Sequence, residues 1–142
     1  MRTKGKNGQA IIETLVGLVV LVPLCLFLLD VGCLVLGQSA NDGLAKHAAR
    51  AAANKTNAVD AQTAAQAVVD AFGTSGIIIA KSLVAGNFNF DPVAGQVTVQ
   101  TQVTVILPIV IPFLPGSVQF QAQQTEPVVA LPPTGGAAAA AS

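Results

Sequence analysis

Residues 8–29 read GQAIIETLVGLVVLVPLCLFLL, an apolar run whose one charged side chain is Glu13. Continued to Leu36, the run takes in only one more charge, Asp30. Residues 14–36 as a helix span about 34 Å at about 1.5 Å per residue, and the hydrocarbon core of a bilayer is about 30 Å thick. The stretch therefore predicts a transmembrane helix, with Asp30 toward its outer interface, where a carboxylate costs least.

The charges before this run set its expected orientation. Arg2, Lys4 and Lys6 precede the apolar segment directly, and Lys and Arg near a membrane span stay on the cytoplasmic side. We therefore expect the N-terminus in the cytoplasm of a bacterial cell, a single pass through the inner membrane, and the C-terminal part exported.

Several other residues of the run have structural consequences. Pro23 removes the hydrogen bond to the Val19 carbonyl, so a kink is expected there. Cys25 and Cys33 are separated by about 12 Å of helical rise, too far for a disulfide, and are interpreted as small apolar side chains.

Composition bounds what the rest of the chain can be. The chain has 142 residues, of which 52% are hydrophobic and 10% charged, which leaves length for one small domain beyond the anchor. Without the three leading cations, four Lys and Arg face seven Asp and Glu, which argues against nucleic acid as a partner. A lone histidine, His47, with no cysteine in the exported part predicts no metal site, no catalytic set, no cofactor and no small-molecule substrate.

The exported part begins as helix. Residues 39–72 are rich in alanine and extend the first helix to about Ala53. Asn57, with Asp60 three residues on, resembles a capping box that opens a second helix, and Phe72–Gly73 closes it. His47 and Arg50, on the first helical part, are interpreted as solvated surface.

The period then changes from helix to strand. Residues 77–84 read as a short strand and Asp91–Gly95 as a tight connection. Valines alternate with Gln and Thr from Gln96 to Leu107, which predicts a strand with one buried face, and Val118–Gln123 alternate in the same way after Pro115–Gly116. We expect a small antiparallel sheet packed on the alanine-rich helix, in an α+β, pilin-like fold.

These patterns divide the chain into four parts. We expect a leader over 1–8, a transmembrane and assembly helix over 9–37, an exported α+β domain over 38–126 and a flexible tail rich in Pro, Gly and Ala over 127–142.

A family resemblance covers most of the chain. It rests on Gly8-Gln9-Ala10-Ile11-Ile12-Glu13, Pro23 within the apolar run, Asp30-Val31-Gly32 at its end, the 48–52 alanine helix, the valine strand and Pro112-Phe113-Leu114-Pro115-Gly116. In these features the chain resembles the TadE-like minor pseudopilins of tight adherence (Flp) pili. The resemblance implies that a prepilin peptidase cuts after Gly8, that Gln9 becomes the mature terminus and that Glu13 is the assembly glutamate. Its partners are then the peptidase, the inner membrane and other pilus or pseudopilin subunits.

Glu13 also has a physical reason to matter. A charge within a bilayer costs about 2.5–3.5 kcal/mol on insertion scales, so it usually has a partner. Cleavage after Gly8 leaves a cationic amine on Gln9 that can pair with Glu13 of a neighbouring subunit.

Two alternatives stay open. One is a type II secretion or type IV pilin-like subunit, although such proteins usually begin with Phe where this chain has Gln9. The other is an uncleaved, signal-anchored envelope protein with a periplasmic interaction domain.

Overall fold

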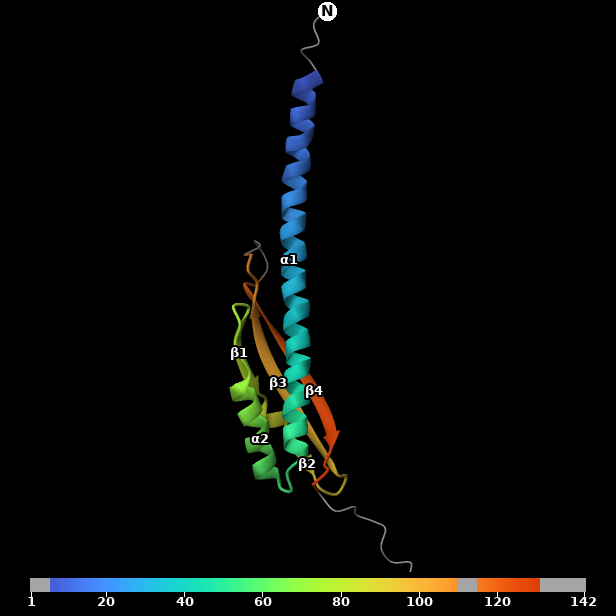
Figure 1. Cartoon of the computed structure of the whole chain (residues 1–142), viewed down its shortest axis with the longest axis vertical. Helices are drawn as coiled ribbons and strands as arrows, with labels where there is room; N and C mark the ends of the chain where they lie inside the picture. Colours follow the sequence, from blue (N-terminus) through green and yellow to red (C-terminus); the bar gives the residue numbers. More distant parts are fainter. Residues whose placement is uncertain (1–5, 110–114, 131–142) are drawn as a thin grey trace, which may run out of the picture.

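The structure, a computed structural model, describes residues 6–109 and 115–130, and its axis is one long helix. Helix α1 runs without interruption from Lys6 to Ala53, with Pro23 inside it. Figure 1 shows α1 extending far beyond the rest of the molecule toward the N-terminus, while its other half lies beside a small sheet. The predicted extension to Ala53 is confirmed, and the kink at Pro23 stays a prediction.

A second helix, α2 (Ala58–Ala71), starts at the predicted cap. The Asp60 backbone N–H donates to Oδ1 of Asn57 (2.8 Å), and Nδ2 of Asn57 donates to the Asp60 carboxylate (2.7 Å). At the other end, the Lys81 ammonium donates to the Asp70 carbonyl (2.8 Å) and to the Phe72 carbonyl. Side chains therefore bind backbone groups at both ends of α2, where the terminal N–H and C=O groups of a helix lack partners within the helix.

Four strands form one antiparallel sheet: β1 (Ile78–Leu83), β2 (Asn89–Asp91), β3 (Gln96–Ile106) and β4 (Ser117–Pro127). Strand β3 is central, with β4 along one edge and β1 and β2 along the other, and a 3₁₀ turn, η1 (Ala85–Asn87), joins β1 to β2. The predicted turn between β2 and β3 is present, because Oδ1 of Asp91 accepts the N–H groups of Val93 and Ala94 and Gly95 has a positive φ of 63°. Glycine adopts this left-handed backbone conformation at the lowest energetic cost, because it has no Cβ.

The predicted alternation along β3 decides which face of the sheet is buried. Alternate side chains from this strand are 0–3% exposed, and they are Val97, Val99, Thr101, Val103, Val105 and Leu107. Fully burying one valine contributes at least about 1.5 kcal/mol, so this face is the main source of stability. The other face carries Gln and Thr side chains that hydrogen bond to each other across strands, such as Gln100 to Gln121 (3.0 Å).

The buried face packs against α1 and α2. The helices contribute small side chains to this core, among them Ala48, Ala49, Ala52, Ala61 and Ala65. At Gly37 the approach of α1 to the sheet is so close that an added Cβ would overlap the Val105 side chain. The alanine-rich composition of the helices is thus what permits short helix-to-sheet distances.

A buried polar contact lies at the centre of this interface. The Thr101 hydroxyl donates to Oδ1 of Asn41 (2.8 Å), and Nδ2 of Asn41 donates to the Phe120 carbonyl oxygen (3.0 Å). Asn41 and Thr101 are both 0% exposed. Asn41 thus joins α1 to both β3 and β4, which fixes the position of the helix along the two strands.

The folded domain continues past residue 126. Pro127 is the last residue of β4, Val128 is buried, and the Val129 N–H donates to the carbonyl of Ala53 at the end of α1 (3.1 Å). The rest of the expected tail, 131–142, and the Pro112–Leu114 part of the resemblance lie outside the described residues.

Gly37→Ala should lower the free energy of unfolding of the α+β domain by about 1–3 kcal/mol, because the new methyl group displaces Val105. Gly43→Ala is the matched control, since a Cβ there meets nothing within 4 Å and helix propensity improves. Urea unfolding followed by circular dichroism in detergent micelles measures both. Equal stabilities for the two variants would contradict the close packing at Gly37.

Asn41→Ala should cost about 1–3 kcal/mol, because it leaves the Thr101 hydroxyl and the Phe120 carbonyl with one partner fewer in a buried site. A double-mutant cycle with Thr101→Val separates this contact from the general effect of a smaller side chain. We expect the two substitutions to be non-additive by at least about 0.5 kcal/mol. Strict additivity would mean that Asn41 and Thr101 act independently.

Candidate membrane and assembly site

No described part of the chain covers the N-terminal half of α1. Every residue from Gly8 to Leu29 is exposed, and Ile11, Val19 and Val20 are more than 60% exposed. The most apolar eighteen-residue window of α1 has a mean hydropathy of 2.8 and is 6% buried. Among the described residues, α1 is the one helix long and apolar enough to cross a membrane, and a helix apolar on all sides is typical of that environment.

The predicted cleavage and assembly residues lie at the free end of this half. Gly8 and Gln9 are in the first turns of α1, and Glu13 follows Gln9 by four residues, on the same side of the helix. All three are exposed, and Glu13 forms no ion pair with any described residue. Thr14 is satisfied locally, since its hydroxyl donates to the Ala10 carbonyl (2.9 Å). Glu13 is therefore the group left open to a partner.

The three predicted leader cations are only partly covered by the structure. Lys6 is the first residue of α1, and Arg2 and Lys4 lie outside the described residues. Their role in orientation stays a prediction.

Asp30 differs from its expected setting. The sequence places it toward the outer membrane interface, but it is 3% exposed, and within the described chain neither carboxylate oxygen has a hydrogen-bond partner. Asp30 is the first buried residue along the described part of α1, and it lies seven residues, about two helical turns, before Gly37. It starts a stripe of buried residues that continues through Gly37, Asn41 and Leu44. A buried carboxylate without a partner is costly, so among the described residues Asp30 is the side chain whose burial is least compensated.

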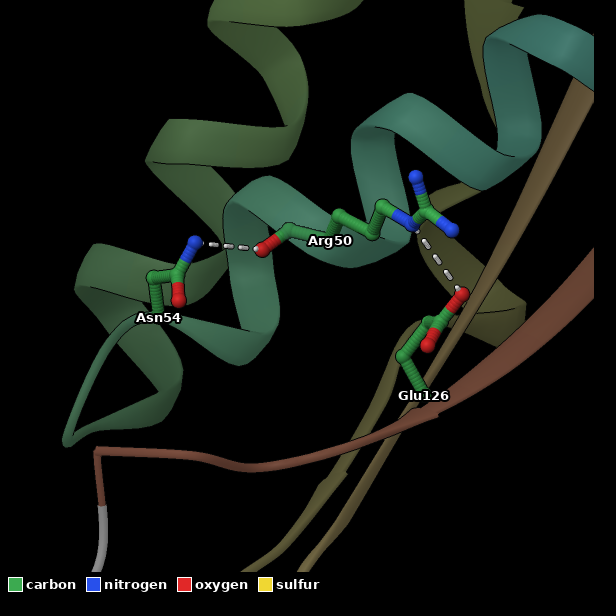
Figure 2. A network of polar contacts seen from close by, with 3 residues as sticks. All are labelled: Arg50, Asn54 and Glu126. Carbon is green, nitrogen blue, oxygen red and sulfur yellow. Dashed lines mark hydrogen bonds and ion pairs between the residues drawn. The ribbon is translucent and has the colours of Figure 1, made fainter.

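The remaining polar residues of α1 lie in its distal half. His47 is exposed, as predicted. Arg50, also predicted as solvated surface, has a 58% exposed side chain, but its Nε lies 3.6 Å from Oε1 of Glu126 on β4, and its carbonyl accepts a hydrogen bond from Nδ2 of Asn54 (3.0 Å). Figure 2 shows this chain of contacts at the end of α1. Such an exposed pair contributes less than about 1 kcal/mol, so it orients the helix end more than it stabilises the domain.

The residues of this candidate site are suited to helix packing and to formation of an ion pair. The described residues contain no group of three or more His, Cys, Asp or Glu side chains that could hold a metal. Cys25 is exposed, Cys33 is partly buried, and both are free thiols. What the arrangement offers is an uncovered apolar helix with one unpaired carboxylate near its end.

The roles predicted for Gly8, Gln9 and Glu13 stay predictions, and sequence reasoning missed the polar contacts that position the helix. Thr101 occupies an apolar-face position in β3, and Asn41 lies on the inner stripe of α1. A polar residue at a position that the period assigns to the core was the available signal, because such a residue needs a buried partner.

Comparison with known proteins gives no match: no family model, no curated protein and no solved structure is similar to this chain.

Asp30→Leu should stabilise the domain by about 1–3 kcal/mol, because it removes a buried carboxylate that has no hydrogen-bond partner among residues 6–109 and 115–130. For a domain of this size that is a rise in Tm of several degrees. Asp42→Leu is the control, since Asp42 is exposed and accepts a hydrogen bond from Gln38. Thermal unfolding in micelles compares the two, and a loss of stability with Asp30→Leu would reveal a partner for the carboxylate.

Proposed function

We propose that this chain is a TadE-like minor pseudopilin that takes part in assembling tight adherence pili, with no catalytic activity of its own. A prepilin peptidase removes residues 1–8, and the chain stays in the inner membrane through the N-terminal half of α1. The exported domain then faces the periplasm, where it meets other pilus or pseudopilin subunits.

The observation that carries the proposal is the exposure of the apolar first half of α1. Its apolar surface is uncovered on all sides from Gly8 to Leu29, while the second half of the same helix is the core of a folded domain. A subunit that moves from bilayer to filament needs such a helix, because neighbouring helices can replace lipid around it. The rigid second half then carries the domain along with the helix.

Glu13 gives this assembly its register. After cleavage, the Gln9 amine lies one helical turn from the Glu13 carboxylate of the same chain and can reach that of a neighbour shifted along the helix axis. A charge pair in a low-dielectric setting is far stronger than in water. Subunits that satisfy both charges are therefore favoured over those that leave one unpaired.

An uncleaved, signal-anchored envelope protein is the second candidate. It is favoured by the exposed Gln side chains of β4, Gln119, Gln121 and Gln123, which offer a polar surface for a periplasmic partner. In that case Glu13 has no special role.

Glu13→Gln should leave cleavage and membrane insertion intact but reduce pilus assembly at least tenfold, because the amine of a neighbouring subunit loses its counter-charge. Sheared surface pili, quantified by immunoblot of the major subunit, measure the effect. Glu126→Gln is the matched control, since it changes the other glutamate, on the far side of the exported domain, and should assemble normally. Normal piliation in Glu13→Gln would reject the pairing mechanism.

A further inference from the structure

We propose that the exported domain lies against the membrane by its own apolar end, so that the β1 and β3 strand ends form a second contact with the phospholipid surface. This inference rests on the membrane placement of α1 in the proposed function, but not on pilus assembly.

Exposed apolar side chains collect at the end of the domain that faces the free half of α1. Beyond Leu29, α1 has three more large apolar residues that are exposed, Val31 (37%), Val35 (63%) and Leu36 (63%). On the sheet, Ile79 is 51% exposed and Ile106 is 37% exposed. These five residues are called the apolar collar here.

The strand register places the sheet members of the apolar collar beside its helix members. Gly37 of α1 meets Val105, the residue before Ile106. Ile79 lies at the irregularity between Ile78 and Ala80, which pair with Val105 and Thr104. Leu36, Ile79 and Ile106 are therefore at about the same height along α1, and Figure 1 shows these ends of β1 and β3 on the side of the molecule toward the N-terminal half of α1.

The stretches that form this end of the domain carry few charged residues, and Asp30, which precedes Val31, is buried. The sequence has no charged residue between Asp30 and Asp42, between Asp70 and Lys81, or between Asp91 and Glu126. Lys81, two residues after Ile79, is the nearest cation in β1, and its ammonium donates to the Asp70 and Phe72 carbonyl oxygens at the end of α2. A surface that is apolar and uncharged over three elements can enter the headgroup region without burying an unpaired charge.

Three exposed valines at the opposite end of the domain differ in their surroundings. Val59, Val93 and Val129 lie next to charged or polar loops and are separated from the apolar surface of α1. Single exposed apolar residues of this kind are ordinary. The apolar collar, in contrast, is continuous with the candidate transmembrane surface.

The length of the apolar surface agrees with this placement. From Ile11 to Leu36, α1 spans about 38 Å, whereas the hydrocarbon core is about 30 Å thick and the bilayer with its headgroup regions about 40–45 Å. If Ile11 lies at the inner boundary of the core, Leu36 and Ile106 lie within the outer interfacial layer. Asp30 is then at membrane depth, and its burial keeps the carboxylate away from lipid.

The chain contains neither Trp nor Tyr, so one inserted Trp is its main fluorophore. Full-length Ile106→Trp and Ile79→Trp are reconstituted in phosphatidylcholine vesicles with or without bromine near the glycerol end of the acyl chains. Leu18→Trp, in the middle of the apolar run, is the positive control, and Val93→Trp, at the β2–β3 turn, is the negative control. Circular dichroism verifies that each variant keeps the native unfolding temperature to within a few degrees.

We expect bromolipid to quench Ile106→Trp and Ile79→Trp several-fold more than Val93→Trp, with emission shifted to shorter wavelength. Quenching of Leu18→Trp alone would overturn the second contact and leave the α1 anchor in place. Absence of quenching in all four variants would overturn the membrane placement of α1 and this inference with it.

Discussion

The packing of α1 on the inner face of β3 is the constraint on which the rest of this structure depends. Gly37 lets the helix approach Val105, and Asn41 binds both Thr101 and the Phe120 carbonyl, so the helix has one position along the sheet. The side chains around this contact are fully buried. Because α1 is one continuous helix, the contacts that fix the position of its second half also set the direction in which its first half leaves the domain.

The two halves of α1 differ in their surroundings. The second half of α1 is amphipathic in effect, with alanines and Leu44 toward the sheet and Asp42, Lys46, His47 and Arg50 toward water. The first half is exposed and apolar on all sides, which is typical of a helix surrounded by lipids or other helices. The change between the two falls from Asp30 to Gly37, where the first buried residues, the apolar collar and the ends of β1 and β3 meet.

Much of this arrangement was predictable from the sequence. The period of two in β3 assigned its valines to the core, and the Asn57 and Asp60 spacing located the start of α2. The contacts that depend on tertiary structure were not predictable: nothing near Thr101 in the sequence points to Asn41, and the position of Asp30 in the apolar run does not show that the folded domain buries it. At the candidate site, Gly8, Gln9 and Glu13 were recognised by their order, and the structure adds that they are exposed on α1 and that Glu13 has no ion-pair partner among the described residues.

The central claim is that the chain becomes a subunit with a new terminus at Gln9, and intact mass spectrometry of the membrane-extracted protein tests it most directly. The account predicts the mass of a chain that begins at Gln9, or of its cyclised form, in cells with a prepilin peptidase, and the full-length mass in cells without one. A full-length mass in both kinds of cell would contradict the account and favour a signal-anchored envelope protein.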